Sequence, residues 1–217
     1  MVYFKKTDSA PSSLIKHTIY NAQDVLDMLE DDFEGKCYIC ESKGIEAINM
    51  EHFAPHKKIN DIRKYSWSNL FWSCSHCNTI KSVTEPILNC TYKNDYVDSN
   101  IRYSLDTDLQ NNKIIIENLT DDVATLNTVK LLTDVYNGTT DQNKLQARVK
   151  RNNLYDELSY FTYIMSKYEL TEDMKKKKKL FKQIKDELSN ESSFTAFKRW
   201  IIRDRKELLA EFENCIK

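Results

Sequence analysis

The chain has 217 residues, enough for one or two domains with a sizeable hydrophobic core. Its 32 lysines and arginines nearly balance its 33 aspartates and glutamates, so it lacks the overall basic excess of a free-standing DNA-binding domain. Any affinity for nucleic acid must then come from a local patch, a metal site or a partner. Three glycines and three prolines favour a mostly helical protein, and no apolar run reaches the roughly 18 residues of a membrane span.

The first half of the chain predicts an arm, a helix and a strand. Residues 1–20 have weak periodicity and predict an extended arm with one short strand. Apolar residues recur at helical spacing from Asn21 to Phe33, and Gly35 stands where a helix C-cap belongs. Residues 45–53 predict a strand. The helix would deliver the chain to the cysteines that follow it.

The second half predicts a hairpin followed by helices. Residues 88–117 contain two short alternating or apolar runs, which favour a β-hairpin. A helix is expected to start at residues 120–122 and to end at Gly138. From Asp141 the apolar stripe predicts one long helix, then further helices over residues 172–188 and 194–212. Residues 172–206 carry 12 lysines and arginines against 6 aspartates and glutamates, a surface on which a nucleic-acid backbone would fit.

Two Cys-x-x-Cys pairs, Cys37 with Cys40 and Cys74 with Cys77, have the spacing of a four-thiolate zinc site. Four thiolates leave no open coordination position, so such a zinc ion is structural. The alternatives are two disulfides or unrelated core cysteines. No secretory signal is visible, and disulfides are rare in the cytosol, so we expect a cytoplasmic protein with a structural Zn²⁺.

The segment between the cysteine pairs, with the helix that follows it, carries residues suited to phosphodiester hydrolysis. His52 is the candidate general base, because its unperturbed pKa lies near neutrality. Glu51 and Asn78 offer oxygen ligands for Mg²⁺ or Mn²⁺, although a regular strand would turn Glu51 and His52 to opposite faces. Asn69 is a candidate to orient the imidazole of His52. Lys81, one helical turn after Asn78, is a candidate phosphate contact.

Each of these residues also has a structural interpretation. A lone histidine is more often a surface or core residue than a base, and Asn69 or Asn78 can cap a helix. Lys57 and Lys58 lie in a basic stretch after Pro55, which is either a solvated loop or a phosphate-binding one. The aromatic residues near the second cysteine pair are expected to be core rather than stacking platforms for bases. The residues alone leave catalysis open.

A resemblance favours the enzyme. The residues Glu51-His52-Phe53-x-Pro55, then Asn69-Leu70, then Cys74-x-x-Cys77-Asn78-x-x-Lys81 resemble the HNH endonuclease family, whose core is a ββα-metal finger. The similarity is greatest to the four-cysteine branch found with retrons and as the nuclease subunit of Septu-type anti-phage systems. Residues 34–42 and 194–204 resemble the same branch outside the finger.

The resemblance implies a role for each matching residue. His52 would be the general base, Asn69 the residue that positions it, and Glu51 and Asn78 ligands of a catalytic Mg²⁺ or Mn²⁺. Asn78 stands where the family name expects a histidine, a departure that favours Mg²⁺ over a transition metal. Septu-type nucleases act with an ATPase partner, so the resemblance implies such a partner here.

These observations predict an α+β, mostly helical protein with a zinc-stapled ββα-metal HNH finger inserted in a helical frame. The expected parts are an N-terminal arm and helix (1–36), the HNH nuclease core (37–90), and a hairpin with C-terminal helices (91–217). The expected function is metal-dependent endonucleolytic cleavage of nucleic acid in anti-phage defence, with DNA rather than RNA as the expected substrate. The alternative is a non-catalytic zinc-finger module that binds nucleic acid or protein and needs the four cysteines but not His52 or Glu51.

Overall fold

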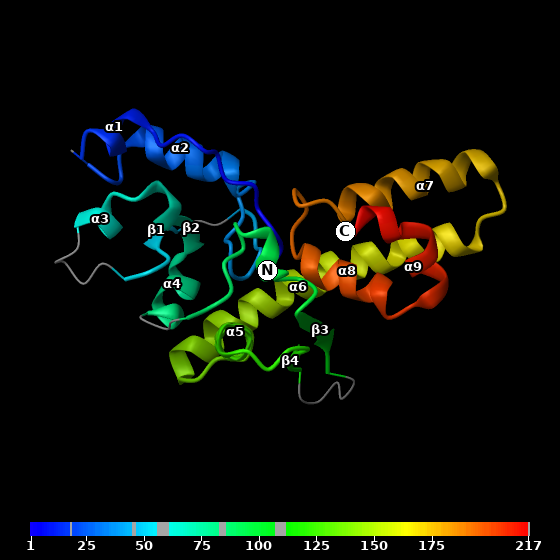
Figure 1. Ribbon diagram of the computed structural model, residues 1–217. Coiled ribbons are helices and arrows are strands. Elements are labelled where there is room, and N and C mark those ends of the chain that lie inside the picture. Colours follow the sequence, from blue (N-terminus) through cyan, green and yellow to red (C-terminus); the bar gives the residue numbers. More distant parts are fainter. Residues whose placement is uncertain (18, 45–46, 56–60, 83–85, 107–111, 217) are drawn as a thin grey trace.

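The computed structural model describes residues 1–17, 19–44, 47–55, 61–82, 86–106 and 112–216. One long helix, α6 (Asp141–Leu170), runs through the middle of the molecule and joins two groups of elements (Figure 1). The N-terminal helices and the first sheet lie on one side of it, and the C-terminal helices gather around its far end. Within the described ranges, no helix is both long and apolar enough to cross a membrane.

The first sheet and the helix after it form a ββα finger. Its elements are β1 (Ile48–His52), α3 (Asp61–Lys64), the 3-10 turn η1 (Trp67–Asn69), β2 (Leu70–Cys74) and α4 (Ser75–Lys81). The strands are antiparallel, with His52 opposite Leu70 and Ile48 opposite Cys74. Every residue of the apolar strand β2 is buried, and α4 packs against both strands. The predicted strand over residues 45–53 is confirmed from Ile48 to His52; Ile45 and Glu46 lie outside the described residues.

The N-terminal arm packs on the finger. It carries α1 (Ser12–Ile15) and α2 (Gln23–Asp32), both of which lie above β1 and β2 in Figure 1. The side-chain amino group of Lys6 donates to the carbonyls of Trp67 and Leu70, and the indole N–H of Trp67 donates to the carbonyl of Thr7 at 2.7 Å. These contacts clamp the arm to the start of β2.

The predicted short strand in the arm is wrong for the described residues, which form the helix α1 instead. Pro11 precedes this helix at φ −58°, and the amide groups of Leu14 and Ile15 donate to its carbonyl. A proline fixes φ near the helical value, so it favours a helix start rather than a strand here. The predicted helix over residues 21–33 is confirmed as α2, and Gly35 after it has a left-handed φ of +63°.

The hairpin and the helix after it follow the sequence prediction. Strands β3 (Ile101–Leu105) and β4 (Ile114–Asn118) pair antiparallel. Helix α5 (Val123–Asn137) starts at Asp122, whose carboxylate accepts a hydrogen bond from the Thr125 amide, and it ends before Gly138. Because α5 packs against β4, α4 and α6, it links the finger to the hairpin and to the long helix.

The C-terminal helices are α7 (Met174–Glu187), α8 (Thr195–Arg203) and α9 (Lys206–Phe212), followed by the 3-10 turn η3 (Glu213–Cys215). The single helix predicted over residues 194–212 is therefore two helices. The amide of Arg205 bonds to the carbonyl of Ile202, three residues back, and this bond tightens the last turn of α8. The carboxylate of Asp204 accepts a hydrogen bond from Arg102 of β3 at 3.1 Å, which holds the junction between α8 and α9 against the hairpin.

Buried apolar residues form two cores. The larger includes residues of the arm, the finger, β3, β4, α5, the first half of α6 and α8. The smaller lies between the second half of α6 and α7, α8 and α9. A mostly helical α+β fold with two small sheets is thus confirmed. The larger core takes residues from all three expected parts, while boundaries at residues 36/37 and 90/91 stay a prediction.

Candidate active site and metal centre

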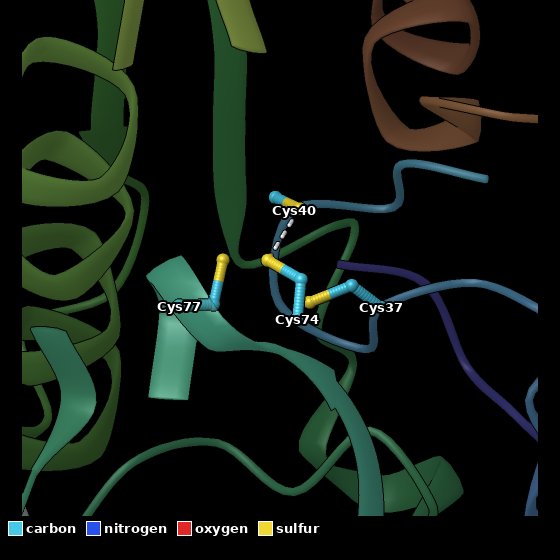
Figure 2. A group of neighbouring side chains, drawn as sticks. All are labelled: Cys37, Cys40, Cys74 and Cys77. Carbon is cyan, nitrogen blue, oxygen red and sulfur yellow. Dashed lines mark hydrogen bonds between the residues drawn. The ribbon is translucent and has the colours of Figure 1, made fainter. Parts of the chain in front are cut away.

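The four cysteines of the two pairs meet at one point. Cys37 and Cys40 come from the loop after α2, Cys74 ends β2, and Cys77 lies in the first turn of α4 (Figure 2). Their four sulfur atoms lie within 4.8 Å of one another, and all four side chains are buried. The described residues contain no disulfide, and each cysteine is a free thiol. The predicted convergence of Cys37, Cys40, Cys74 and Cys77 is confirmed.

The donor set fits a zinc ion. Zinc–sulfur bonds of about 2.3 Å in a tetrahedron separate the sulfurs by about 3.8 Å, and the Sγ atoms of Cys40 and Cys74 are 3.9 Å apart. Two serine hydroxyls lie near the sulfurs, with Ser42 Oγ 3.3 Å from Cys40 Sγ and Ser73 Oγ 3.8 Å from Cys37 Sγ. Although burial lowers it, the four nearby thiolates raise the pKa of Lys150. The cluster thus has the ligands, spacing and compensating charge of a structural zinc site.

His76 is a structural residue inside the second cysteine pair. Its Nε2 lies 2.9 Å from the carbonyl of Val135 in α5, and its Nδ1 lies 2.7 Å from the side-chain oxygen of Gln146 in α6. Both ring nitrogens are therefore engaged with the helical frame, and neither serves the cysteine cluster. Cys90 and Cys215 lie outside the cluster, and burial raises the pKa of the Cys90 thiol.

His52 ends β1 and is half-buried. Its Nε2 lies 3.1 Å from the carbonyl oxygen of Lys64, the last residue of α3. A carbonyl only accepts, so Nε2 carries a proton, and in the neutral ring Nδ1 holds the lone pair. The ring also meets the edge of Tyr20 at a centroid distance of 5.3 Å. This arrangement leaves Nδ1 as the basic atom of His52.

Asn69 holds the backbone on both sides of His52. Its Oδ1 accepts from the Ala54 amide at 2.7 Å, and its Nδ2 donates to the carbonyls of Ala54 and Arg63, each at 2.9 Å. Ala54 is two residues after His52, and Arg63 directly precedes Lys64, whose carbonyl meets the imidazole. The amide thus connects the segment that follows His52 to the segment whose Lys64 carbonyl meets the imidazole, while a role for Asn69 in positioning a base stays a prediction.

Glu51 and Lys81 form a buried ion pair. The distance from Lys81 Nζ to Glu51 Oε1 is 2.7 Å, with side-chain exposures of 0% and 5%. Lys81 Nζ also donates to the carbonyl of Phe53 at 2.8 Å. Burial raises the pKa of Glu51, and the neighbouring ammonium partly opposes this. The second carboxylate oxygen, Oε2, is buried with no hydrogen-bond partner among the described residues.

This pair bears on two of the sequence expectations. Lys81 is fully buried and paired with Glu51, so its role in binding nucleic acid stays a prediction and requires the pair to separate. Glu51 faces away from His52, as the alternation of a regular strand requires. A role for Glu51 as a metal ligand stays a prediction and requires the pair with Lys81 to separate.

Asn78 lies on α4, one helical turn before Lys81. Its side chain is half-buried, and within the described part of the chain its amide makes no recorded hydrogen bond. The i, i+3 spacing puts Asn78 on the face of α4 from which Lys81 reaches the end of β1. The amide oxygen is therefore available as a ligand for a metal ion beside the finger strands.

Some residues near His52 were not anticipated from the sequence. The Lys64 carbonyl carries no sequence signal, because any residue supplies one. His17 is exposed and stacks on Tyr65 at a centroid distance of 4.8 Å. The candidate phosphate contacts Lys57 and Lys58, and His56 beside them, lie outside the described residues. Trp67, Phe71 and Trp72 are buried, which confirms their predicted place in the core.

The comparisons with known proteins agree with this geometry. The family model described as HNH endonuclease matches residues 37–84. The match begins at the first cysteine of the cluster and includes both finger strands and α4. Residues 37–84 thus form an HNH endonuclease domain with a four-cysteine cluster, and this family implies a phosphodiester hydrolase. Searches of curated proteins and of solved structures found no match.

Proposed function

We propose that the chain is a metal-dependent endonuclease that hydrolyses phosphodiester bonds of nucleic acid, with DNA as the substrate and His52 as the general base. One observation carries this assignment. The Lys64 carbonyl holds the proton of the neutral imidazole on Nε2, so the lone pair that makes His52 basic is on Nδ1 at the end of β1.

In the proposed mechanism, Nδ1 of His52 takes a proton from a water molecule as the water attacks phosphorus. The bond to the leaving 3′ oxygen then breaks on the opposite side, and that oxygen is protonated from solvent. Asn69 keeps the imidazole in place by holding the backbone at Ala54 and Arg63. Because the base is already held near the reactive geometry, less entropy is lost on reaching the transition state, and the activation free energy of hydrolysis is lower.

The divalent cation of the proposed reaction has one fitting donor among the described residues. The Asn78 amide is half-buried and makes no recorded hydrogen bond there, and its oxygen suits Mg²⁺ or Mn²⁺. When bound, such a cation offsets negative charge on the phosphate and the leaving oxygen. Glu51 would join this site only after release from Lys81.

Helix α7 offers a surface for the phosphate backbone of the substrate. Of the basic residues between positions 172 and 206, Lys198 and Arg199 are buried and pair with carboxylates, so they do not contribute to this surface. The lysines of α7 are mostly exposed and fall on one segment, residues 175–185. Neutralising phosphate charge with lysines makes binding salt-dependent. The proposed nuclease should therefore lose affinity for DNA steeply as salt rises.

Cleavage of supercoiled plasmid with Mg²⁺ or Mn²⁺ tests the proposal. We expect the purified chain to nick plasmid, and His52→Gln to leave it intact, because glutamine retains an N–H for the Lys64 carbonyl but has no basic atom. Zinc content and thermal unfolding of the variant should match the wild type. Full activity in His52→Gln would overturn the role of His52. The alternative is a non-catalytic zinc-finger module. It would be favoured if the wild type binds plasmid but does not cleave it, either alone or with an ATPase partner added.

We further propose that this nuclease is the effector of an anti-phage system and acts with an ATPase partner. The support is the resemblance of residues 34–42 and 194–204 to the branch found in Septu-type and retron-associated systems. Co-purification with an ATPase from the same host tests the partnership, and plaque counts with and without His52→Gln test the defence. Wild-type protection equal to that of the variant would contradict the defensive role.

A further inference from the structure

A cavity lies away from the residues of the HNH domain. Its volume is about 420 Å³, and it lies between the N-terminal arm, the segment around the 3-10 turn η2 (Lys93–Asp95), and helix α8. Tyr3 and Ile216, near the two ends of the chain, both line it, and those ends lie close together in Figure 1. The cavity shares no lining residue with the HNH site. Its size falls in the range that encloses a small organic ligand.

Three tyrosines line this cavity: Tyr3, Tyr92 and Tyr96. Tyr92 and Tyr96 are 56% and 60% exposed, which is unusual for large aromatic side chains in a braced loop. Tyr96 has the left-handed backbone angles φ +44° and ψ +42°, and its carbonyl accepts from the amides of Ser99 and Asn100. A non-glycine residue held in this region costs free energy, so the surrounding structure must fix it. The backbone that carries Tyr96 is therefore held in one conformation.

Asp98 fastens this loop to α8. Its carboxylate pairs with Arg199 at 2.9 Å and with Arg203 at 3.3 Å. Its carbonyl accepts from the indole of Trp200 at 2.9 Å and from Arg203 at 2.7 Å. Four contacts from one helix thus hold a single loop residue, and they place both guanidinium groups at the wall of the cavity. The cavity is a built feature, with an aromatic side and a cationic side.

The charged residues of the cavity lining are mostly basic. Among the described residues of the lining, Lys93, Arg199 and Arg203 are opposed by Asp98 alone, and Lys93 Nζ lies 5.6 Å from the centre of the Tyr3 ring. A guanidinium has five N–H donors. Among the described residues, Arg199 uses four of them and Arg203 three. Donors remain for an anion in the cavity.

We propose that this cavity binds a nucleotide unit, with its base against the tyrosines and its phosphate at Lys93 and the two arginines. Aromatic rings stack on any base, and arginine and lysine bind phosphate, so the lining matches both parts of a nucleotide. A sugar phosphate lacks the ring, and an uncharged aromatic compound lacks the anion. The nucleotide is either free or the 5′-phosphorylated end of a strand, since both present the same chemistry.

Calorimetric titration of the full chain tests this site. The chain carries His52→Gln, and no divalent cation is added, so that the HNH domain neither cleaves nor bridges the ligand. The probes are the four nucleoside monophosphates, inorganic phosphate, and thymidine tetranucleotide with and without a 5′ phosphate. We expect nucleotides to bind more tightly than inorganic phosphate. Tighter binding of the phosphorylated tetranucleotide than of the monophosphates identifies a strand end, and equal or weaker binding identifies a free nucleotide.

Variants locate the binding. Tyr92→Ala and Lys93→Glu should each weaken nucleotide affinity about tenfold, as expected for one lost stacking or charge contact. The matched controls are Tyr163→Ala and Lys167→Glu on α6, where a tyrosine of 60% exposure also lies under a lysine, at 5.4 Å. The controls should leave the affinity unchanged. The proposal is overturned if no probe binds, or if nucleotides bind and the two pairs of variants behave alike.

Discussion

Lys81 and Glu51 neutralise each other inside the finger, with 2.7 Å between Nζ and Oε1. The lysine comes from α4 and the glutamate from β1, so the pair joins the helix to the strand that carries His52. Lys81→Met should destabilise the protein by about 3–5 kcal/mol, because it leaves a buried carboxylate without its counter-charge. Urea unfolding measures this loss.

The double variant Glu51→Gln with Lys81→Met is the control for this prediction. It removes both charges, so it should recover much of the stability lost in the single variant. A double variant as unstable as Lys81→Met alone would show that packing, rather than charge pairing, makes Lys81 important. Retained nuclease activity in a folded double variant would show that the carboxylate of Glu51 is not essential for metal binding.

Asn69→Ala should slow cleavage with little effect on substrate affinity. The alanine removes three hydrogen bonds to the backbone at Ala54 and Arg63, so the segments around His52 lose their common anchor. We expect kcat to fall at least tenfold while KM changes little, because the base is misplaced and not removed. Steady-state kinetics on a plasmid or duplex substrate measure both constants. An unchanged kcat would assign Asn69 to folding alone.

Cys74→Ser should release zinc and destabilise the chain. A serine in place of one thiolate opens the coordination shell, and structural zinc contributes directly to folding. Metal analysis should give about one zinc per wild-type chain and much less in the variant, with a lower Tm. Cys215→Ser is the matched control, since this half-buried cysteine lies outside the cluster. Equal zinc contents in the two variants would contradict the site.

Lys6 should make stability depend on pH. Burial lowers its pKa from 10.5 to about 7, with a smaller opposing effect from Asp32. Between these pH values the unfolded chain holds a proton that the folded chain has released, so stability contributed by this group rises with pH. Chemical unfolding from pH 7.5 to 9.5 should show a slope up to about 1.4 kcal/mol per pH unit steeper in the wild type than in Lys6→Met. Parallel curves would mean that Lys6 stays protonated in the fold.

Sequence reasoning succeeded where a pattern determines the contact. Cysteine spacing determined the cluster, and helical or alternating periodicity gave α2, α5, α6 and the hairpin, because these patterns reflect which face is buried. It did not predict the ion pair of Lys81, since a lysine at the end of a short helix has the pattern of a surface cation. Only the tertiary fold shows that Glu51 lies within reach of it.

Other features have no pattern in the sequence. The partner of His52 is the backbone carbonyl of Lys64, which any residue type would supply. Asn69 also acts on backbone atoms, so its contacts follow from the path of the chain and not from the identity of a partner side chain. The cavity beside Asp98 draws on residues from positions 3 to 216, a separation that local periodicity does not record.

The second cysteine pair is tied to the rest of the molecule by His76, which reaches Val135 and Gln146, while the Tyr136 hydroxyl donates to the carbonyl of Cys40 at 2.8 Å. A finger transplanted into a foreign scaffold would lose these partners and expose the buried face of α5. Recombination that swaps the finger alone should therefore yield unstable chimaeras, whereas exchange of residues 1–203 together would preserve these contacts and those of the larger core. The nuclease and its frame are expected to be inherited as one unit.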